Sequence, residues 1–340
     1  MRPSLRLNYV LRFILALLLV PSLAVLPAAA PAAQVTIHIQ EWDVPTPNSL
    51  PHDPAVAPDG SLWYTGQHSN TLGRLDPKTG KIREYILKTS GSGPHGLTAD
   101  VEDNIWFTAN YKAYIGKLNP LTGAVTEYPM PDPAARDPHT PVFDQKGMLW
   151  FTVQGGNFIG RLDPKTGAIR LKQPPTPDSR PYGIAVTAKG IPFFCELATN
   201  KLAAVNPETM EITEYVLPAG ARPRRLAVAP GDAIYYTDFA RGYLGRLDPS
   251  GGKVEEWASP GGPDSRPYGI AVTPDGTVWY SEAGIRPNTI VRFDPKKRSF
   301  DTWPIPSGGG VVRHMVATPG GELYIACSGV NKVGIVRVGK

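Results

Sequence analysis

Cysteine is scarce in this chain, which has two Cys among its 340 residues. Cys195 and Cys327 are too few for the framework of disulfide bonds that many small secreted domains use, so we expect both to be free thiols. The fold therefore has to be interpreted from the periodicity and the repeats of the sequence.

The hydrophobic run at residues 13–25 is too short for a comfortable membrane span. Three arginines precede it and small residues follow, which is the pattern of a secretory signal peptide over residues 1–32. We expect the mature chain to begin near Ala33 and to be secreted or periplasmic, with no membrane association after cleavage. Retention of this segment as an uncleaved anchor is the alternative.

Without the predicted signal peptide, the chain also has little excess of positive over negative charge. The formal net charge is +5, and residues 1–32 hold three Arg and no acid, which leaves 32 Lys and Arg against 30 Asp and Glu, or +2. No dense basic block follows, so the composition gives no electrostatic case for binding nucleic acid. The short motifs of common enzyme classes are absent as well: there is no nucleophile elbow, P-loop, Rossmann glycine pattern or His-Glu-x-x-His.

What the chain does contain is a seven-fold repeat with spacings of 42 to 45 residues. The copies begin at Pro51, Pro94, Pro138, Pro181, Pro223, Pro267 and Val312. An aromatic marks the second apolar run of each copy: Trp63, Trp106, Trp150, Phe193, Tyr235, Trp279 and Tyr324. In the copy at 267–306, four short alternating runs are separated by turn residues, which indicates a four-stranded antiparallel meander.

This period with four strands per copy is typical of a β-propeller. The seventh copy lacks its fourth strand, and residues 38–42 resemble the missing strand. We therefore predict an all-β, seven-bladed propeller over residues 33–340, closed by the N-terminal strand, with no helix after residue 33. We expect the marker aromatics to pack between blades.

Propeller geometry brings equivalent residues into rings around a central channel. The residue after each copy's first position is His52, His95, His139, Tyr182, Arg224, Tyr268, and Arg313 or His314. A second ring, three residues beyond each marker aromatic, contains three acids at Glu196, Asp238 and Glu282. Histidines would occupy one arc of the channel mouth and acids the opposite arc.

Facing arcs of imidazole and carboxylate suggest a general base beside a divalent cation. We predict His314 or His95 as the base and Glu282, Glu196 and Asp238 as metal ligands. We predict substrate contacts from His52, His139, Tyr182, Arg224, Tyr268 and Arg313. The alternative for any one of these residues is a structural role. A histidine could hydrogen bond to the backbone of a neighbouring blade at the start of its strand, and a glutamate could cap the loop that follows its strand.

The repeats resemble the streptogramin B lyase family, also called virginiamycin B lyases. The resemblance rests on PHGL (94–97), IWFT (105–108), YIGKLNPLTG (114–123), VTEYPMP (125–131) and RHMVATPGGELYIACSGVNKVGIVRV (313–338), and it covers essentially the whole mature chain. It implies a seven-bladed propeller that opens cyclic depsipeptides by elimination, with a His base and Mg²⁺ held by glutamates.

The last copy departs from that family pattern. The resemblance sets His314 at the position of the base, but Val312 and Cys327 or Ser328 stand where it implies the two glutamates. We expect a monomeric C–O lyase that opens a small cyclic ester. The alternatives are a non-catalytic periplasmic propeller that binds a ligand or protein, and a lactone hydrolase.

Overall fold

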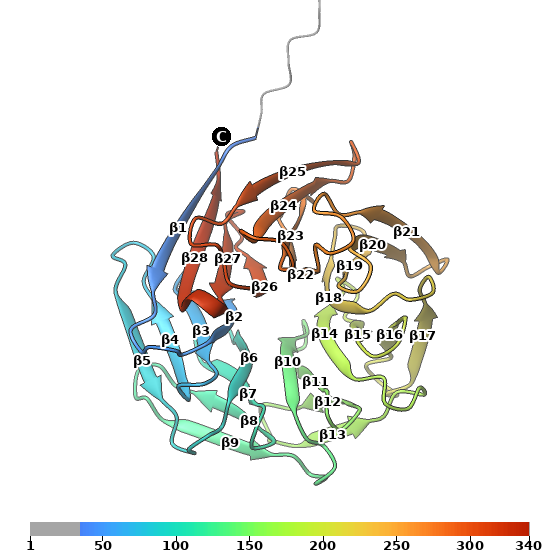
Figure 1. The fold of residues 1–340 in the computed structure, drawn as a ribbon. Coiled ribbons are helices and arrows are strands. Elements are labelled where there is room, and N and C mark those ends of the chain that lie inside the picture. The colour runs from blue at the N-terminus through green and yellow to red at the C-terminus, as the bar shows by residue number, and fades with distance from the viewer. Residues whose placement is uncertain (1–34, 340) are drawn as a thin grey trace, which may run out of the picture. The chain divides into compact units, whose positions relative to one another are not determined.

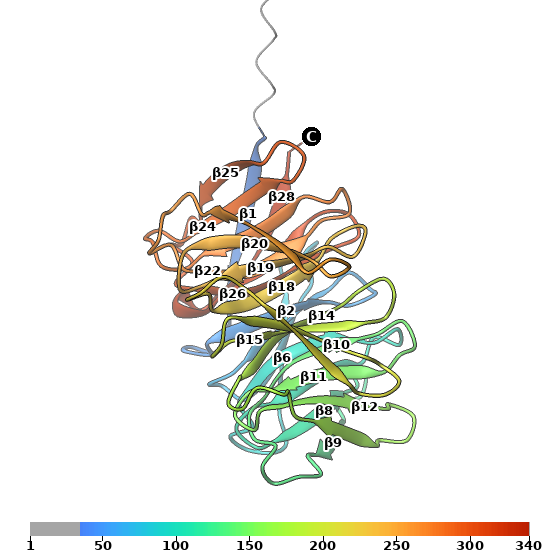
Figure 2. The same cartoon turned by 90° about the vertical axis from the view of Figure 1, so that its right-hand side faces the viewer.

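Seven four-stranded antiparallel sheets stand around a ring in the computed structural model, which describes residues 35–339 (Figure 1). Each sheet is one blade of a propeller, and the side view shows the ring as a thick disc with loops on both faces (Figure 2). The prediction of a seven-bladed all-β propeller is confirmed. The expected signal peptide lies outside the described residues.

In six blades the strands run outward from the channel in chain order, and in the seventh β1 takes the outermost position after β26, β27 and β28. The innermost strands are β2 (Pro51–Val56), β6 (Pro94–Ala99), β10 (Pro138–Phe143), β14 (Pro181–Val186), β18 (Pro223–Val228), β22 (Pro267–Val272) and β26 (Val312–Ala317). The second strands are β3 (Leu62–Gly66), β7 (Ile105–Ala109), β11 (Leu149–Val153), β15 (Pro192–Glu196), β19 (Ile234–Asp238), β23 (Val278–Glu282) and β27 (Leu323–Cys327).

The two outer positions complete each blade. The third strands are β4 (Thr71–Leu75), β8 (Tyr114–Leu118), β12 (Phe158–Leu162), β16 (Lys201–Val205), β20 (Tyr243–Asp248), β24 (Thr289–Asp294) and β28 (Lys332–Val338). The outermost strands are β5 (Ile82–Ile86), β9 (Val125–Pro129), β13 (Ile169–Lys172), β17 (Ile212–Val216), β21 (Lys253–Ala258), β25 (Ser299–Pro304) and β1 (Ile37–Asp43). Among residues 35–339 the one helical element is η1 (Ser328–Val330), a 3-10 turn.

The two ends of the chain close the ring. Strand β1 pairs with β28 in the sheet order β1-β28-β27-β26, with Ile37 opposite Val338 and Asp43 opposite Lys332. The predicted closure by the N-terminal strand is therefore confirmed. Because the chain passes from β1, the outermost strand of the last blade, to β2, the innermost strand of the first blade, this pairing fastens the two blades to each other.

The core lies between neighbouring blades. The seven marker aromatics are all buried, and one apolar cluster combines Trp63 and Leu72 of the first blade with Ile105 and Phe107 of the second. Burying a large apolar side chain contributes roughly 1.5–3 kcal/mol, so these contacts make blade-to-blade packing the main source of stability. The predicted packing role of the aromatics is confirmed, and Cys195 and Cys327 are both buried free thiols, as expected.

Hydroxyl groups link the backbones of adjacent innermost strands. Thr65 accepts a hydrogen bond from the Asp53 amide and donates to the carbonyl of His95 in the next blade at 2.7 Å. The same inter-blade bond recurs from Thr108 to His139, Thr152 to Tyr182, and Thr237 to Tyr268, while Ser281 donates to Val312, one position earlier in its strand. Cys195 and Ala326 occupy the two remaining positions, and Ser328 supplies the last link by donating to Pro51.

Candidate functional site

A β-bulge near the start of every innermost strand determines which side chains reach the channel. In the first blade Pro51 pairs with Gly66, but the next pair is Pro54 with Tyr64, so two residues of β2 stand opposite one of β3. The other six blades have the same irregularity. A bulge re-aims side chains. Here it brings two successive residues of each blade to the mouth, the end of the channel where the innermost strands begin.

The register settles one position that the sequence left open. Val312 pairs with Cys327 as Pro51 pairs with Gly66, so Arg313, and not His314, is equivalent to His52. His314 is equivalent to Asp53, the second residue of the bulge. The structure therefore places His314 one residue beyond the position that His52, His95 and His139 occupy in their blades.

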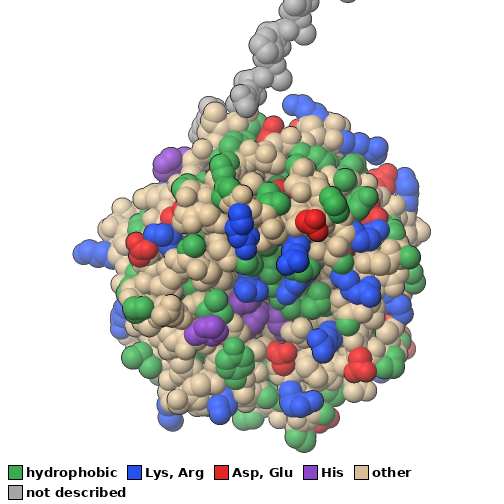
Figure 3. Space-filling view, viewed as in Figure 1, with side chains coloured by type: hydrophobic (Ala, Val, Ile, Leu, Met, Phe, Trp, Pro, Cys, Tyr) green, Lys and Arg blue, Asp and Glu red, His purple; other side chains and the backbone are tan. Residues whose placement is uncertain are grey.

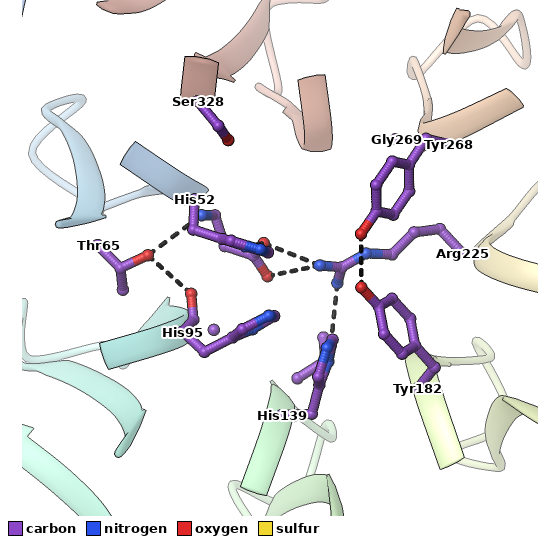
Figure 4. Close-up of polar contacts among 12 residues, drawn as sticks. His52, Thr65, His95, His139, Tyr182, Arg225, Tyr268, Gly269 and Ser328 are labelled. Atoms are coloured by element: carbon purple, nitrogen blue, oxygen red, sulfur yellow. Dashed lines mark hydrogen bonds and ion pairs between the residues drawn. The ribbon is translucent and has the colours of Figure 1, made fainter. Parts of the chain in front are cut away.

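Three histidines and a tyrosine lie in an unbroken row around the mouth. The ring centroids of His52 and His95, of His95 and His139, and of His139 and Tyr182 are each 3.8 Å apart. Figure 4 shows these rings pointing inward from four consecutive blades. The predicted histidine arc is present, although it continues into Tyr182 instead of including His314.

These imidazoles are neutral at physiological pH. Burial lowers the pKa of His52 to about 4 despite its hydrogen bond to Asp53, and burial with neighbouring cations and imidazoles holds the pKa values of His95 and His139 well below 6.5. Burial and Arg225 lower the pKa of His314 to about 3. Nδ1 of His95 and of His314 is buried without a hydrogen-bond partner.

An ion pair crosses the channel directly beneath this row. Nη2 of Arg225 donates to both carboxylate oxygens of Asp53, and Nη1 donates to Thr140 at 2.9 Å (Figure 4). Burial alone would raise the pKa of Asp53, but Arg225, His314 and His52 hold it well below its usual range. Because an ionised Asp53 can only accept, His52 carries its proton on Nδ1, which lies 2.8 Å from the carboxylate.

Glycine makes room for this long crossing side chain. The residue of β14 equivalent to Asp53 is Gly183, where an added Cβ would lie 3.3 Å from Cδ of Arg225 and 2.8 Å from its Cα. Sequence reasoning made no prediction for Asp53, and it suggested Arg225 only as one of three arginines, with Arg222 and Arg224, that could pair with the acids or bind a substrate carboxylate. The repeat alignment does contain a sign of this pair. Three of the seven copies have Gly at this position, whereas the copies with Asp53 and Arg225 have residues of opposite charge.

Arginine and tyrosine side chains form the opposite side of the mouth. The Arg224 guanidinium lies 4.2 Å from the ring centroid of Tyr268 and 5.2 Å from that of Tyr182, and Arg313 lies 5.9 Å from Tyr268. The hydroxyls of Tyr182 and Tyr268 are 2.5 Å apart. Burial would raise the pKa of Tyr268, but Arg224, Arg225 and Arg313 lower it below its ordinary value.

The three carboxylates predicted as metal ligands do not meet at the mouth. Glu282 accepts from Ser259, the Gly261 amide and Thr289, all within its own blade and its entry loop. It therefore anchors that loop.

The other two acids are engaged in the same local way. Asp238 accepts from Arg241 and from the amide of Arg222. Glu196 accepts from Thr199, and burial with the neighbouring Glu214 raises its pKa to about 7. The structure does not bring these three acids together, because each carboxylate binds the loop beside its own strand end.

One other group of potential ligands exists in the described part of the chain. His52, Asp53 and His95 offer donor atoms within 4.8 Å of one another. Mg²⁺ prefers an octahedron of oxygens, whereas two of these three donors are imidazoles, and both oxygens of Asp53 already bind Arg225. The residues at the mouth therefore do not fit the Mg²⁺ that the resemblance implies.

The chain is similar to known lyases in both sequence and structure. A family model described as the virginiamycin B lyase family matches residues 32–205 and 175–339. The virginiamycin B lyase of Nocardia farcinica is 35% identical over 101 residues, which are 30% of this chain and 35% of that protein. The matched stretch thus spans about a third of this curated relative.

Solved structures match over nearly the full propeller. A streptogramin B lyase structure aligns with a TM-score of 0.81 at 25% identity, covering 89% of this chain and 98% of that one. A catalytically inactive histidine-to-alanine variant of Staphylococcus aureus virginiamycin B lyase with quinupristin aligns equally well, covering 88% and 99%. With the family model matched along the whole described propeller, the chain belongs to the virginiamycin B lyase family.

Proposed function

We propose that this protein is a secreted or periplasmic, monomeric carbon–oxygen lyase that opens a small cyclic ester by elimination. The observation that carries the proposal is the row of buried, neutral imidazoles at the channel mouth of a member of this lyase family. A neutral imidazole can take a proton, whereas an imidazolium cannot.

In the proposed reaction, His95 or His314 removes a proton from the carbon next to a carbonyl group. The electron pair of that C–H bond forms a carbon–carbon double bond, and the adjacent C–O bond breaks. The ester carboxylate leaves with the electrons of the C–O bond. The ring opens without uptake of water, so the product is an isomer of the substrate. His52, His139, Tyr182, Tyr268, Arg224 and Arg313 surround the substrate in this proposal.

The test is to incubate the purified protein with quinupristin in water enriched in oxygen-18. Elimination gives a linear product of unchanged mass with no isotope uptake. We expect His95→Gln and His314→Ala to lower kcat by roughly 10²–10⁴-fold while circular dichroism stays unchanged. The matched control is His38→Ala, because His38 is exposed on the outermost strand β1. Full activity of both mouth variants would contradict the assignment of the base.

Two other functions are tested by the same experiment. A non-catalytic binding propeller is favoured by the finding that the acids Glu196, Asp238 and Glu282 do not converge, and it would show saturable quinupristin binding without any product. A lactone hydrolase would release a product heavier by one water that carries the isotope. Either result would replace elimination as the function.

A further inference from the structure

The mouth has more positive than negative charge. Of its three guanidinium groups, Arg225 is neutralised by Asp53, which is 1% exposed. Among the ion pairs of residues 35–339, none includes Arg224 or Arg313. Nε of both residues is buried and has no hydrogen-bond partner. An unpaired donor removed from water costs free energy, so such a pair of groups indicates an anionic ligand.

Aromatic rings hold these donors in a defined orientation. The Arg224 guanidinium is sandwiched near Phe239, at 4.3 Å from its ring centroid, and near Tyr268 at 4.2 Å. The Arg313 guanidinium also lies near Tyr268, at 5.9 Å from its ring centroid. A guanidinium held beside aromatic rings can present its N–H donors in the bidentate hydrogen bonds that suit a carboxylate.

More arginines border the same side of the mouth. Arg180, Arg222 and Arg266 are exposed and directly precede the first residue of three consecutive blades. Arg266 lies 5.7 Å from the ring of Phe239, which also contacts Arg224. Figure 3 shows Lys and Arg side chains around the central hollow, in which His side chains are visible. A cleft lined by one sign of charge concentrates ligands of the opposite sign.

We propose that the substrate carries a carboxylate on the carbon that loses its proton, and that Arg224 and Arg313 hold this carboxylate. The reaction class rests on the proposed function. The two guanidiniums would neutralise the negative charge that develops on the carboxylate as the proton leaves. A metal ion could stabilise the same negative charge, but Glu196, Asp238 and Glu282 do not come together to bind one. The two guanidiniums would therefore take this role.

The reaction balances without a further reagent. The base removes the proton beside the carboxylate, the C–H electrons form a double bond to the neighbouring carbon, and the bond from that carbon to oxygen breaks. The leaving oxygen takes the bonding electrons and, in net terms, the proton that the base removed, and departs as an alcohol or acid. An oligomer of uronic acid has this arrangement in every unit, so trigalacturonate serves as a probe of the carboxylate site, whereas the substrate of the proposed function is a cyclic ester that carries such a carboxylate.

The test measures binding of trigalacturonate by calorimetry, with galactotriose as the neutral counterpart. We expect saturable binding of trigalacturonate that weakens with salt and no binding of galactotriose. Arg224→Gln and Arg313→Gln should each weaken binding roughly tenfold or more, because each removes charged hydrogen bonds. The control is Arg170→Gln, which removes the same charge from the exposed outer strand β13. Arg313→Lys keeps the charge and should recover only part of the affinity.

The outcomes separate this inference from the proposed function. Equal binding of galactotriose, or unchanged binding in both mouth variants, would overturn the inference. Inorganic phosphate that binds as tightly as trigalacturonate would also overturn it, because the site would then hold any small oxyanion. Elimination of quinupristin without trigalacturonate binding would support the proposed function alone. Specific trigalacturonate binding without an unsaturated product would support the anion site alone, and the proposed lyase activity would then be decided by the quinupristin experiment.

Discussion

Nη2 of Arg225 lies 2.8 Å from Oδ1 of Asp53, so a single ion pair ties β18 to β2 across the channel. The two residues are 172 positions apart in the chain and are each 1% exposed. The pair therefore links two blades on different sides of the channel. Removal of either partner would leave a buried charge without compensation.

Asp53→Asn should therefore lower the free energy of unfolding by about 3–5 kcal/mol. Removing both charges together, in Asp53→Leu/Arg225→Met, should recover most of this loss because no charge is left buried. Urea unfolding of the wild type, both single variants and the double variant measures the coupling. Additive losses in the double variant would show that the two residues do not interact.

Acid should destabilise the protein before its carboxylates are protonated. His52, with a pKa of about 4, stays neutral in the folded state, as do His95 and His139, while each accepts a proton in the unfolded chain near pH 6.5. The unfolded state thus binds more protons, and stability falls as the pH drops from about 6.5 towards 4, by about 1.4 kcal/mol per pH unit for each histidine.

Unfolding free energies measured at about pH 7, 6 and 5 check this dependence. His139→Gln should reduce the slope of unfolding free energy against pH by the contribution of one histidine. His38→Gln should leave this slope unchanged, because His38 is exposed. A flat profile for the wild type would mean that the histidines of the mouth are protonated in the folded protein.

Cys195→Thr should stabilise the propeller. Cys195 stands in β15 where Thr65, Thr108, Thr152 and Thr237 donate to the next blade, and the equivalent acceptor is the carbonyl of Arg224. A new buried hydrogen bond contributes about 0.5–1.5 kcal/mol. Thermal unfolding compares this variant with Thr108→Val, which removes one such bond and should lose a similar amount. Lower stability of Cys195→Thr would show that its hydroxyl finds no acceptor.

Loss of the predicted metal ligands should not change any response to Mg²⁺. Glu282 and Glu196 bind different loops and share no ligand site. Calorimetric titration with Mg²⁺ should give the same trace for the wild type and for Glu282→Gln/Glu196→Gln. Saturable binding that is present in the wild type and absent from the double variant would restore the carboxylates as a metal site.

Tyr268 should serve the proposed elimination as a proton donor to the leaving oxygen. Its hydroxyl hydrogen bonds to Tyr182, and three guanidiniums lower its pKa below 10. The acid form is lost as the pH rises through this lowered pKa, so kcat should fall on the alkaline side earlier than for an ordinary tyrosine. Tyr268→Phe should lower kcat by roughly 10²–10⁴-fold with little change in KM. An unchanged alkaline limb in this variant would exclude Tyr268.

The sequence by itself determined the architecture. Alternating apolar residues and turn residues act over a few positions, so each copy of the repeat forms the same meander regardless of its neighbours. The N-terminal strand was also recognisable, because Glu41-Trp42 matches the outer strands of other copies and the seventh copy lacked one. The ring of His52, His95 and His139 followed from equivalent positions alone.

Only the tertiary structure decided where the side chains point. The bulge brings Asp53, Arg225 and His314 into the channel, and no local pattern specifies that Arg225 should meet a carboxylate four blades away. The sequence placed Glu282 correctly at the end of its strand. Its carboxylate, however, accepts hydrogen bonds from the nearby Ser259 hydroxyl and Gly261 amide and does not point to the mouth. Strand positions depend on local periodicity, whereas the chemistry of the site depends on which distant blades meet across the channel.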